Sequence, residues 1–483
     1  MTVTRFAPSP TGYLHIGGLR TALYAYLLAK HDQGRFILRI EDTDQSREVT
    51  GATENILVIL KKFGFTWDEG LFLSANDEIT EKGANGPYIQ SKRLELYKKY
   101  AEQLVVSGHA YHCFCSSERL AELRDKQTAE KLPPRYDGHC RDLSPEEINK
   151  RISAGEPYVI RLKVPREGEV EFIDPIRGKI TFACAEVDDQ VLMKSDGFPT
   201  YHLAVVVDDH LMEVTHVLRG DEWLPSTPKQ ILLYQYLNWE MPVFAHLPVI
   251  TNPDHTKLSK RQGDVAVEQY LAKGYLPEAI INYMVLLGWH PTGDREFFTL
   301  SELVEVFSLA RVSPSSAIFD LEKLKWFNAH YLKEKSVAEL VNLCQPFLPQ
   351  VEPEKLEKII ASTRDRLNIL SDIIEIAEVY LTIADYAPLL LNFKQTPPER
   401  TTDALSAFIN KLESVEIDWT AENLKQLLMT VGAENNFSNG EIFWPTRIAL
   451  SGLAKSQPPE EIMAVLGKEE SLNRLRNAKN KLG

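Results

Sequence analysis

Apolar residues alternate between strand-like and helix-like spacing over the first part of the chain. Thr2–Phe6 is a short apolar run, followed by two prolines and a glycine. The next segment carries leucines four residues apart, which share one face of a helix: Leu19, Leu23 and Leu27. Arg35–Asp42 predicts a second strand, and Gly51–Phe65 an amphipathic helix. Such alternation indicates a parallel sheet with helices on both faces, where ligands bind beyond the carboxyl ends of the strands.

The pattern changes between residues 96 and 197. A charged helical stretch, Ser116–Glu130, precedes two runs that are typical of antiparallel strands, Glu156–Pro165 and Lys179–Cys184. We interpret this region as an α+β insertion between two halves of the sheet. The sheet is expected to resume near Tyr201, with the run Val205–Val207 as part of it, and to end around residues 249–250.

Strand signals nearly vanish after about residue 335. Apolar residues recur at helical spacing over 337–348, 356–381 and 402–415, and a polar stretch with two prolines, Lys394–Asp403, separates two groups of helices. The chain is therefore predicted to be multidomain, α/β plus all-α. It would contain a Rossmann-type parallel-sheet domain with an α+β insertion, a linking helical domain, and an all-helical C-terminal region.

Composition fits this picture. A chain of 483 residues is too long for one core, and no run of 18 apolar residues occurs in it. Its N-terminus lacks a basic-then-apolar signal region, so we expect a cytoplasmic protein that does not enter a membrane. The net charge of −14 argues against a generally nucleic-acid-binding surface, but a local basic surface would suffice for RNA.

The segment Arg5–Gly18 carries the most informative chemistry. A strand that breaks into a turn and then a helix N-terminus presents unpaired N–H groups and a positive dipole to an anion. His15 adds a donor at that point. Far downstream, KLSKR (Lys257–Arg261) supplies two lysines that would neutralise a polyphosphate, Lys257 and Lys260.

This pair of segments resembles the signatures of class I aminoacyl-tRNA synthetases. Three further segments, in the same order, narrow the resemblance to bacterial-type glutamyl-tRNA synthetases: RIEDTD (Arg39–Asp44), GPYIQSKR (Gly86–Arg93) and Phe198–Trp223. Glutaminyl synthetases generally carry C-terminal β-barrels, so the helical C-terminal region favours the glutamyl family. Two positions depart from the pattern: Gly18 replaces a histidine, and Arg261 replaces a serine.

The resemblance implies a role for each part of the chain. Residues 1–95 and 198–254 would form the two halves of the catalytic Rossmann fold, and 96–197 the inserted domain that binds the tRNA acceptor stem. Residues 255–335 would form a stem-contact linking domain that begins with KLSKR. Residues 336–392 and 393–483 would be two helical subdomains that bind the anticodon.

The implied enzyme is a ligase. It would activate L-glutamate with ATP to glutamyl-adenylate, release pyrophosphate, and transfer glutamate to the terminal ribose 2′-hydroxyl of tRNA-Glu. Mg²⁺ is expected to accompany ATP, bound through phosphate oxygens. The resemblance leaves open whether tRNA-Gln is also charged, and we expect a monomer.

The resemblance also assigns site residues. The glutamate pocket would contain Arg5, the Ala7 backbone, Ser9, Glu41, Tyr201 and Arg219. Arginines suit bidentate recognition of carboxylates, and Glu41 offers the charge opposite to the ammonium. ATP would be bound by His15, Gly17, Gly18, Lys257 and Lys260, of which His15 and both lysines would act in catalysis. Candidate anticodon contacts are Arg364, Arg366 and Trp444, with the basic tail Arg474, Arg476, Lys479 and Lys481 as further tRNA contacts.

Five cysteines do not make a disulfide framework. Three have a spacing that holds zinc if a fourth ligand is present: Cys113, Cys115 and Cys140. Some family members close such a site with a histidine, where this chain has Asp142, and others with a tyrosine, where it has Tyr136. Zinc and three reduced thiols without metal remain alternatives; Cys184 and Cys344 are expected in the core.

Three other functions are alternatives. An enzyme that glutamylates a modified tRNA base is a shorter relative without the helical anticodon module. A cytidylyl- or adenylyltransferase shares the His-x-Gly segment but needs neither contacts of the Glu41 type nor that module. A non-catalytic tRNA-binding protein would have no need of His15, Lys257 and Lys260, and charging activity would rule it out.

Overall fold

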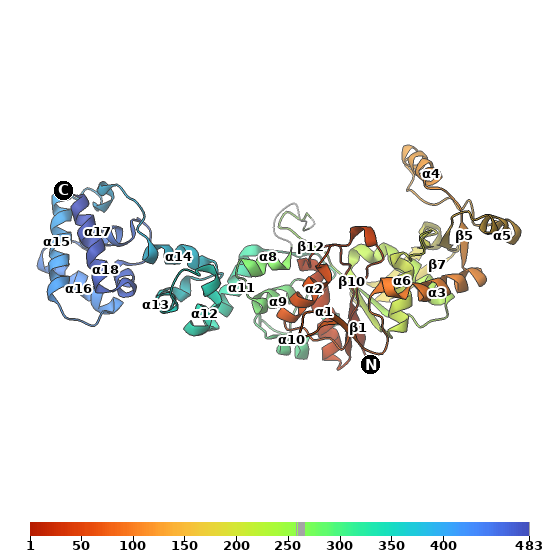
Figure 1. Ribbon diagram of the computed structural model, residues 1–483, viewed down its shortest axis with the longest axis horizontal. Coiled ribbons are helices and arrows are strands. Elements are labelled where there is room, and N and C mark those ends of the chain that lie inside the picture. Colours follow the sequence, from red (N-terminus) through yellow and green to blue (C-terminus); the bar gives the residue numbers. More distant parts are fainter. Residues whose placement is uncertain (257, 259–265, 483) are drawn as a thin grey trace. The chain divides into compact units, whose positions relative to one another are not determined.

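The structure, a computed structural model, describes residues 1–256, 258 and 266–482 (Figure 1). It divides into two units. The first comprises Met1–Ala272 and Pro277–Leu324, and the second Lys273–Leu276 and Lys325–Gly483. None of the helices in the described residues is both long enough and apolar enough to cross a membrane.

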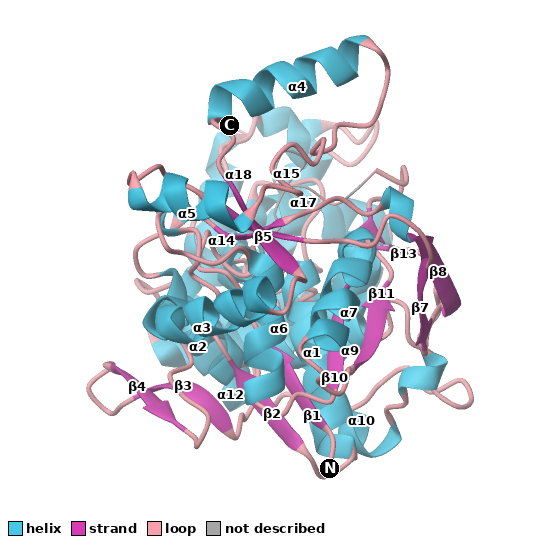
Figure 2. Cartoon of the chain, turned by 90° about the vertical axis from the view of Figure 1, so that its right-hand side faces the viewer, coloured by secondary structure: helices cyan, strands magenta, loops and turns pink. Residues whose placement is uncertain are grey.

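A parallel sheet forms the centre of the first unit. β1 (Val3–Phe6), β2 (Arg35–Leu38) and β3 (Glu69–Leu73) are parallel neighbours, and β4 (Ile79–Lys82) is antiparallel to β3. β10 (His216–Gly220) and β11 (Val243–Leu247) form a second parallel pair. The Thr215 N–H, just before β10, donates to the Val3 carbonyl at 2.9 Å. Figure 2 accordingly shows the strands in one row from β4 through β1 to β11, which brings the carboxyl ends of β1, β2 and β10 together.

Helix α1 (Ile16–His31) is buried on most of its surface because several elements cover it. It contacts β1, β2 and β10 as well as α9 (Pro277–Val285) and α10 (Leu300–Val306). The predicted strand and helix that follow it are confirmed. The remaining elements here are α2 (Ala52–Lys62), α3 (Leu94–Val106), α7 (Thr227–Tyr236), β12 (Ile250–Thr251), α8 (Val267–Ala272) and β13 (Ala317–Ile318).

The prediction that the sheet resumes at Val205–Val207 is wrong. These residues lie in helix α6 (Tyr201–Leu211), and the next strand of the sheet is β10. All residues from Leu203 to Asp209 are buried. A continuous apolar run of this length is equally typical of a buried strand and of a buried helix, so periodicity could not separate them.

The inserted region contains antiparallel strands, as predicted. β5 (Ala110–Cys113), β6 (Val159–Leu162) and β9 (Val191–Met193) form one sheet, and β7 (Glu169–Asp174) pairs with β8 (Gly178–Ala183) as a hairpin. Two helices here bury no residue, α4 (Ser117–Ala129) and α5 (Pro145–Ser153). The hairpin contacts the core of the first unit, because β7 lies against β11 and α7.

The second unit is helical, which confirms the predicted fold class. No strand occurs among its described residues, 273–276 and 325–482. It contains most of α11 (Leu321–Glu334), then α12 (Val337–Cys344), α13 (Pro353–Thr363), α14 (Asp372–Leu381), α15 (Pro398–Ser414), α16 (Ala421–Glu434), α17 (Asn439–Ser451) and α18 (Pro459–Lys481). Gly467 interrupts α18 at a φ of 80°, a conformation that glycine adopts without steric cost. α15, α16 and α17 all pack against α18.

Candidate active site

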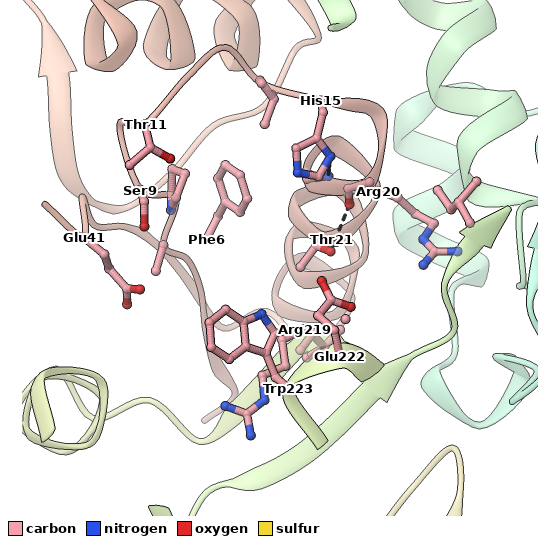
Figure 3. A pocket seen from close by; sticks show the side chains of 18 of the residues that line it. Phe6, Ser9, Thr11, His15, Arg20, Thr21, Glu41, Arg219, Glu222 and Trp223 are labelled. Carbon is pink, nitrogen blue, oxygen red and sulfur yellow. Dashed lines mark hydrogen bonds between the residues drawn. The ribbon is translucent and has the colours of Figure 1, made fainter. Parts of the chain in front are cut away.

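A cavity of about 530 Å³ opens at the carboxyl ends of β1 and β10 (Figure 3). It is lined by the turn after β1, the start of α1, the segment after β2, the start of α6 and the end of β10. The predicted site residues that line it are Arg5, Ala7, Ser9, His15, Gly17, Gly18, Glu41, Tyr201 and Arg219. Lys257 and Lys260 lie outside the described residues.

His15 caps the N-terminus of α1. Its Nδ1 accepts the Gly18 N–H at 3.0 Å, so the neutral ring carries its proton on Nε2. A Cβ atom at Gly18 would lie 3.0 Å from the Leu14 side chain, so glycine avoids crowding at this position. The turn of α1 that holds His15 faces the cavity, and its first N–H groups can bind an anion (Figure 3).

The turn after β1 is held against the segment after β2. The Glu41 N–H donates to the Pro8 carbonyl at 3.0 Å, which places Glu41 beside Ala7 and Ser9. From the side of α6, Tyr201 lines the same cavity with its ring 4.3 Å from that of Trp223, centroid to centroid.

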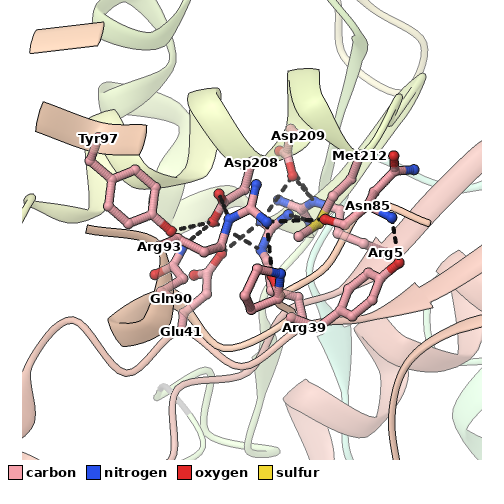
Figure 4. Close-up of polar contacts among 12 residues, drawn as sticks. Arg5, Arg39, Glu41, Asn85, Gln90, Arg93, Tyr97, Asp208, Asp209 and Met212 are labelled. Atoms are coloured by element: carbon pink, nitrogen blue, oxygen red, sulfur yellow. Dashed lines mark hydrogen bonds and ion pairs between the residues drawn. The ribbon is translucent and has the colours of Figure 1, made fainter. Parts of the chain in front are cut away.

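Arg5 and Glu41 belong to a set of buried charges that spans three elements (Figure 4). Arg39 donates to Glu41 at 2.9 Å and contacts Asp209 at 2.8 Å. Arg5 Nε lies 3.2 and 3.3 Å from the two Asp209 oxygens. Burial by itself raises the pKa of Asp209, but the charges of Arg5 and Arg39 outweigh it and lower the pKa overall. Burial dominates at Glu41 and raises its pKa.

Asp208 extends these contacts away from the cavity. Its carboxylate accepts hydrogen bonds from Gln90 at 2.8 Å, Arg93 at 2.7 Å and Tyr97 at 2.9 Å (Figure 4). We call the six charged residues the charge cluster: Arg5, Arg39, Arg93, Glu41, Asp208 and Asp209. It holds three positive and three negative side chains, all of them buried, so the charges of the cluster balance.

Arg219 is buried but is held differently from Arg5. Its guanidinium donates to four neutral acceptors: His246 Nε2 at 3.1 Å, Gln230 Oε1 at 2.6 Å, Thr227 Oγ1 at 2.8 Å and the Tyr201 hydroxyl at 3.5 Å. Burial lowers the pKa of Arg219. In the part of the chain that the structure describes, no carboxylate forms an ion pair with it, so its charge is available to an anionic ligand in the cavity.

Comparison with known proteins identifies the family. Residues 1–326 match the catalytic domain of tRNA synthetases class I (E and Q), and residues 339–479 match an anticodon binding domain. The glutamate–tRNA ligases of Alkaliphilus metalliredigens and Clostridioides difficile are each 46% identical to the chain, over 99% of its length and 99% of theirs. The chain belongs to the glutamate–tRNA ligase family.

Solved glutamate–tRNA ligases have the same fold. A crystal structure of the Elizabethkingia meningosepticum ligase, in complex with its amino acid, aligns with a TM-score of 0.90 at 36% identity, covering 100% of both chains. The Elizabethkingia anophelis synthetase gives 0.88 at 35% identity, over 99% of both chains. Because full-length ligases match over nearly their whole length, the chain is assigned to them rather than to shorter relatives or to nucleotidyltransferases.

The three clustered cysteines of this family member fit a tetrahedral metal. Their Sγ atoms all lie within 4.8 Å of one another, and zinc–sulfur bonds of about 2.3 Å require sulfurs about 3.8 Å apart. The Tyr136 hydroxyl lies 3.3 Å from Cys113 Sγ and 3.4 Å from Cys115 Sγ. Asp142 is exposed and pairs with Lys163. Tyr136, rather than Asp142, is thus the side chain that lies beside the thiols. Cys184 and Cys344 are core residues, as expected.

Arg364 and Arg366, in the second unit, differ in their hydrogen-bond partners. Both lie in a short 3₁₀ turn after α13. Arg364 donates to the backbone carbonyls of Lys333 and Lys335, at the end of α11. Arg366 forms a surface ion pair with Glu461 at 2.8 Å and is 41% exposed. Such exposed pairs contribute little to stability, so this ion pair can open at little cost.

Two other candidate tRNA contacts, Trp444 and Arg474, have internal partners. Trp444 Nε1 donates to the Leu390 carbonyl at 2.8 Å. Arg474 is buried, and its guanidinium donates to the carbonyls of Val379 and Leu450, both at 2.7 Å. A role for Arg474 as an exposed tRNA contact is therefore wrong: it ties α18 to the ends of two other helices.

Sequence reasoning missed the residues behind the cavity. Arg39 and Asp209 position Arg5 and Glu41, and His246 contacts Arg219. The sequence does contain an indication that Asp209 is buried with a partner, because two adjacent acids within an apolar run must find buried partners. His246 had none, since a single histidine in a short strand is more often a core residue.

Proposed function

We propose that this chain is a glutamate–tRNA ligase that activates L-glutamate with ATP and transfers it to the terminal ribose 2′-hydroxyl of tRNA-Glu. The observation that carries the proposal is the convergence of two kinds of group in one cavity. One is a helix N-terminus capped by His15, which suits a polyphosphate. The other is the set Arg5, Arg219 and Glu41, which suits an amino acid with two carboxylates.

Glutamate binding follows from the charges of these side chains. Arg219 has no carboxylate partner in the described part of the chain and would bind a substrate carboxylate through its planar N–H groups. Arg5 forms an ion pair with Asp209 and would therefore contribute less than Arg219 to binding of a substrate carboxylate. Glu41 would bind the ammonium, because a cation brought beside it favours the ionised carboxylate whose pKa burial has raised.

Activation joins the α-carboxylate of glutamate to the α-phosphorus of ATP and releases pyrophosphate. The attacking carboxylate is already ionised, so no general base is needed. The His15 Nε2–H and the Gly17 N–H would stabilise the charge that develops on the phosphates, whereas the Gly18 N–H would do so only by giving up its bond to His15 Nδ1. Lys257 and Lys260 are assigned to the triphosphate by the family pattern alone. Mg²⁺ would be held by phosphate oxygens rather than by a cage of side chains.

The cysteine cluster supports a structural zinc site. Cys113, Cys115 and Cys140 would supply thiolates and Tyr136 the fourth ligand, as their mutual distances support. A site closed by four protein ligands has no position for substrate, so zinc here would stabilise the inserted region rather than take part in the reaction.

Anticodon reading is proposed for Arg366. It is exposed and its ion pair with Glu461 is weakly held, which supports contact with a base edge or face. We expect Arg364 and Trp444 to hold the surrounding backbone, in keeping with their carbonyl partners. Whether tRNA-Gln is also charged depends on the difference between the affinities of the protein for tRNA-Glu and for tRNA-Gln.

We further propose a cytoplasmic monomer. All five cysteines are free thiols, as is usual for proteins of reducing compartments. The large apolar side chains with the greatest exposure do not share one helix or strand face; they are Val106, Met1, Ile173 and Leu389. Light scattering after size exclusion would give the mass of one chain, and twice that mass would contradict the proposal.

The decisive test is charging of purified tRNA-Glu and tRNA-Gln with labelled glutamate, ATP and Mg²⁺. Wild-type protein is expected to charge tRNA-Glu, and Lys260→Ala to charge it far more slowly. Arg366→Ala should raise the KM for tRNA while leaving the KM for glutamate unchanged. If the wild-type protein charges neither tRNA, the proposal fails and a nucleotidyltransferase or binding protein takes its place. Charging of both tRNAs would show that the anticodon site accepts glutamine tRNAs.

A further inference from the structure

A buried pair, His246 and Asp174, lies next to Arg219 without lining the cavity. His246 is on β11 and is fully buried, and Asp174 ends β7 in the inserted hairpin with only 1% of its surface exposed. The His246 Nδ1 lies 2.8 Å from Asp174 Oδ2, and its Nε2 lies 3.1 Å from Arg219 Nε. The imidazole therefore bridges a carboxylate and a substrate-site guanidinium.

The hydrogen bonds fix the state of the ring. A guanidinium Nε can only donate, so the His246 Nε2 must accept. The proton of the neutral imidazole is then on Nδ1, where Asp174 accepts it. Burial lowers the pKa of His246, which agrees with a neutral ring between Asp174 and Arg219.

Asp174 is itself firmly held. One oxygen accepts the N–H groups of Ile176 and Arg177 at 2.8 and 3.1 Å, and the other accepts the His246 N–H at 3.0 Å. The Arg177 guanidinium donates to the His246 carbonyl at 3.3 Å and to Asp221 at 2.7 Å. The turn of the inserted hairpin is thus held in place by hydrogen bonds to the backbone and ring of His246.

A neutral acceptor behind Arg219 has a consequence that a carboxylate would not have. Arg5, which pairs directly with Asp209, has its charge largely cancelled. Arg219 is oriented by four neutral groups but has no direct negative partner among the described residues; the four belong to His246, Gln230, Thr227 and Tyr201. Its guanidinium is therefore fixed in rotation while it keeps its full charge for a ligand.

We propose that His246, held by Asp174, is a positioning residue for glutamate: it orients the Arg219 guanidinium toward a substrate carboxylate without neutralising it. This inference rests on the proposed function, because it assumes that the cavity binds glutamate. Tight positioning matters because a shift of about 1 Å in a binding group can cost about a hundredfold in rate.

Two neutral substitutions at one position separate the Nδ1 contact with Asp174 from the Nε2 contacts with Arg219 and with Thr227 Oγ1, which lies 3.0 Å away. His246→Asn places an amide near the former Nδ1, so it can still donate to Asp174 but cannot reach Arg219. His246→Gln places its amide oxygen near the former Nε2, so it can still accept from Arg219 but loses the bond to Asp174. Each variant serves as the matched control for the other.

The readouts are the KM for glutamate, the KM for ATP and the unfolding temperature, measured with tRNA-Glu charging by the full-length protein. His246→Asn should raise the KM for glutamate between about tenfold and about a hundredfold and leave that for ATP within about twofold. His246→Gln should raise the KM for glutamate by clearly less than His246→Asn does, although it should lower the unfolding temperature at least as much.

Equal KM values for glutamate in the two variants would overturn the inference. So would a KM for glutamate that rises in proportion to the loss of unfolding temperature in each variant, because His246 would then have a purely structural role. If neither His246 variant folds, Asp174→Asn is the substitute, because asparagine keeps the shape of aspartate and one acceptor oxygen. Asp174→Asn should raise the KM for glutamate. An unchanged KM for glutamate would overturn the inference. Wild-type protein is assayed in parallel. Failure of the wild type to charge tRNA would refute the proposed function, whereas failure of the variants to differ would refute only this inference.

Discussion

Asp209→Asn tests whether the charge cluster holds the site together. Asp209 is 2% exposed and contacts Arg39 at 2.8 Å and Arg5 at 3.2 Å. The substitution keeps the shape and one acceptor oxygen but leaves three buried arginines against two carboxylates. Removing one partner of a buried pair costs about 3–5 kcal/mol, and we expect the lower end, about 3 kcal/mol, because one hydrogen bond can survive.

Hydrogen exchange of the first unit is the appropriate assay, because a chain with two units need not unfold in one step. About 3 kcal/mol corresponds to roughly a hundredfold faster exchange of the slowest amides in β1 and β2. Asp44→Asn is the matched control: its pair with Arg47 is largely exposed, so exchange should not change.

A double variant sharpens the test. Arg39→Gln with Asp209→Asn restores the balance of charge and should be less destabilised than the sum of the two single variants. Exchange within about twofold of wild type in Asp209→Asn would refute the reasoning, because a buried charge without its partner is predicted to cost far more.

Three further outcomes are expected. His15→Ala should lower the charging rate at saturating glutamate by about a hundredfold, with little change in the KM for glutamate; steady-state kinetics that show an unaltered rate would contradict its role. Metal analysis after dialysis against a chelator should find zinc in the wild type, less in Tyr136→Phe and none in Cys140→Ala, whereas equal contents would contradict the proposed ligands. The folded-state pKa of Asp209 is lowered from 3.8, so its contribution to stability is complete above about pH 3.8 and is lost as pH falls through the lower folded value. Acid unfolding of Asp209→Asn should therefore be less steep, and an identical slope would argue against this linkage.

Local signals predicted the parts of the fold that local physics determines. The turn of prolines and glycine after β1 and the leucine spacing of α1 placed helix α1 correctly, because these residues act over a few positions. Helix α6 escaped prediction for the opposite reason. Its valines are buried on every side, so no polar face revealed a helical period.

The contacts behind the cavity depend on pairings between distant segments. Arg93 and Asp208 are 115 residues apart in sequence, and Arg219 and His246 meet only because β10 and β11 are neighbours. A sequence shows that Asp208 and Asp209 need partners, but it does not show which arginines supply them. Family resemblance identified residues that line the cavity, whereas those that hold them in place required the tertiary structure.

The place of β1 within its sheet has a consequence for synthesis of the chain. Val3 and Thr215, which join β1 to the start of β10, are 212 residues apart. At about 5–20 residues per second, roughly 10–40 s pass on the ribosome between the appearance of the two strands. During that interval one edge of the first strand has no partner and can pair with other chains. The insertion, residues 96–197, therefore accounts for about half of the time for which each nascent chain is exposed to misassembly.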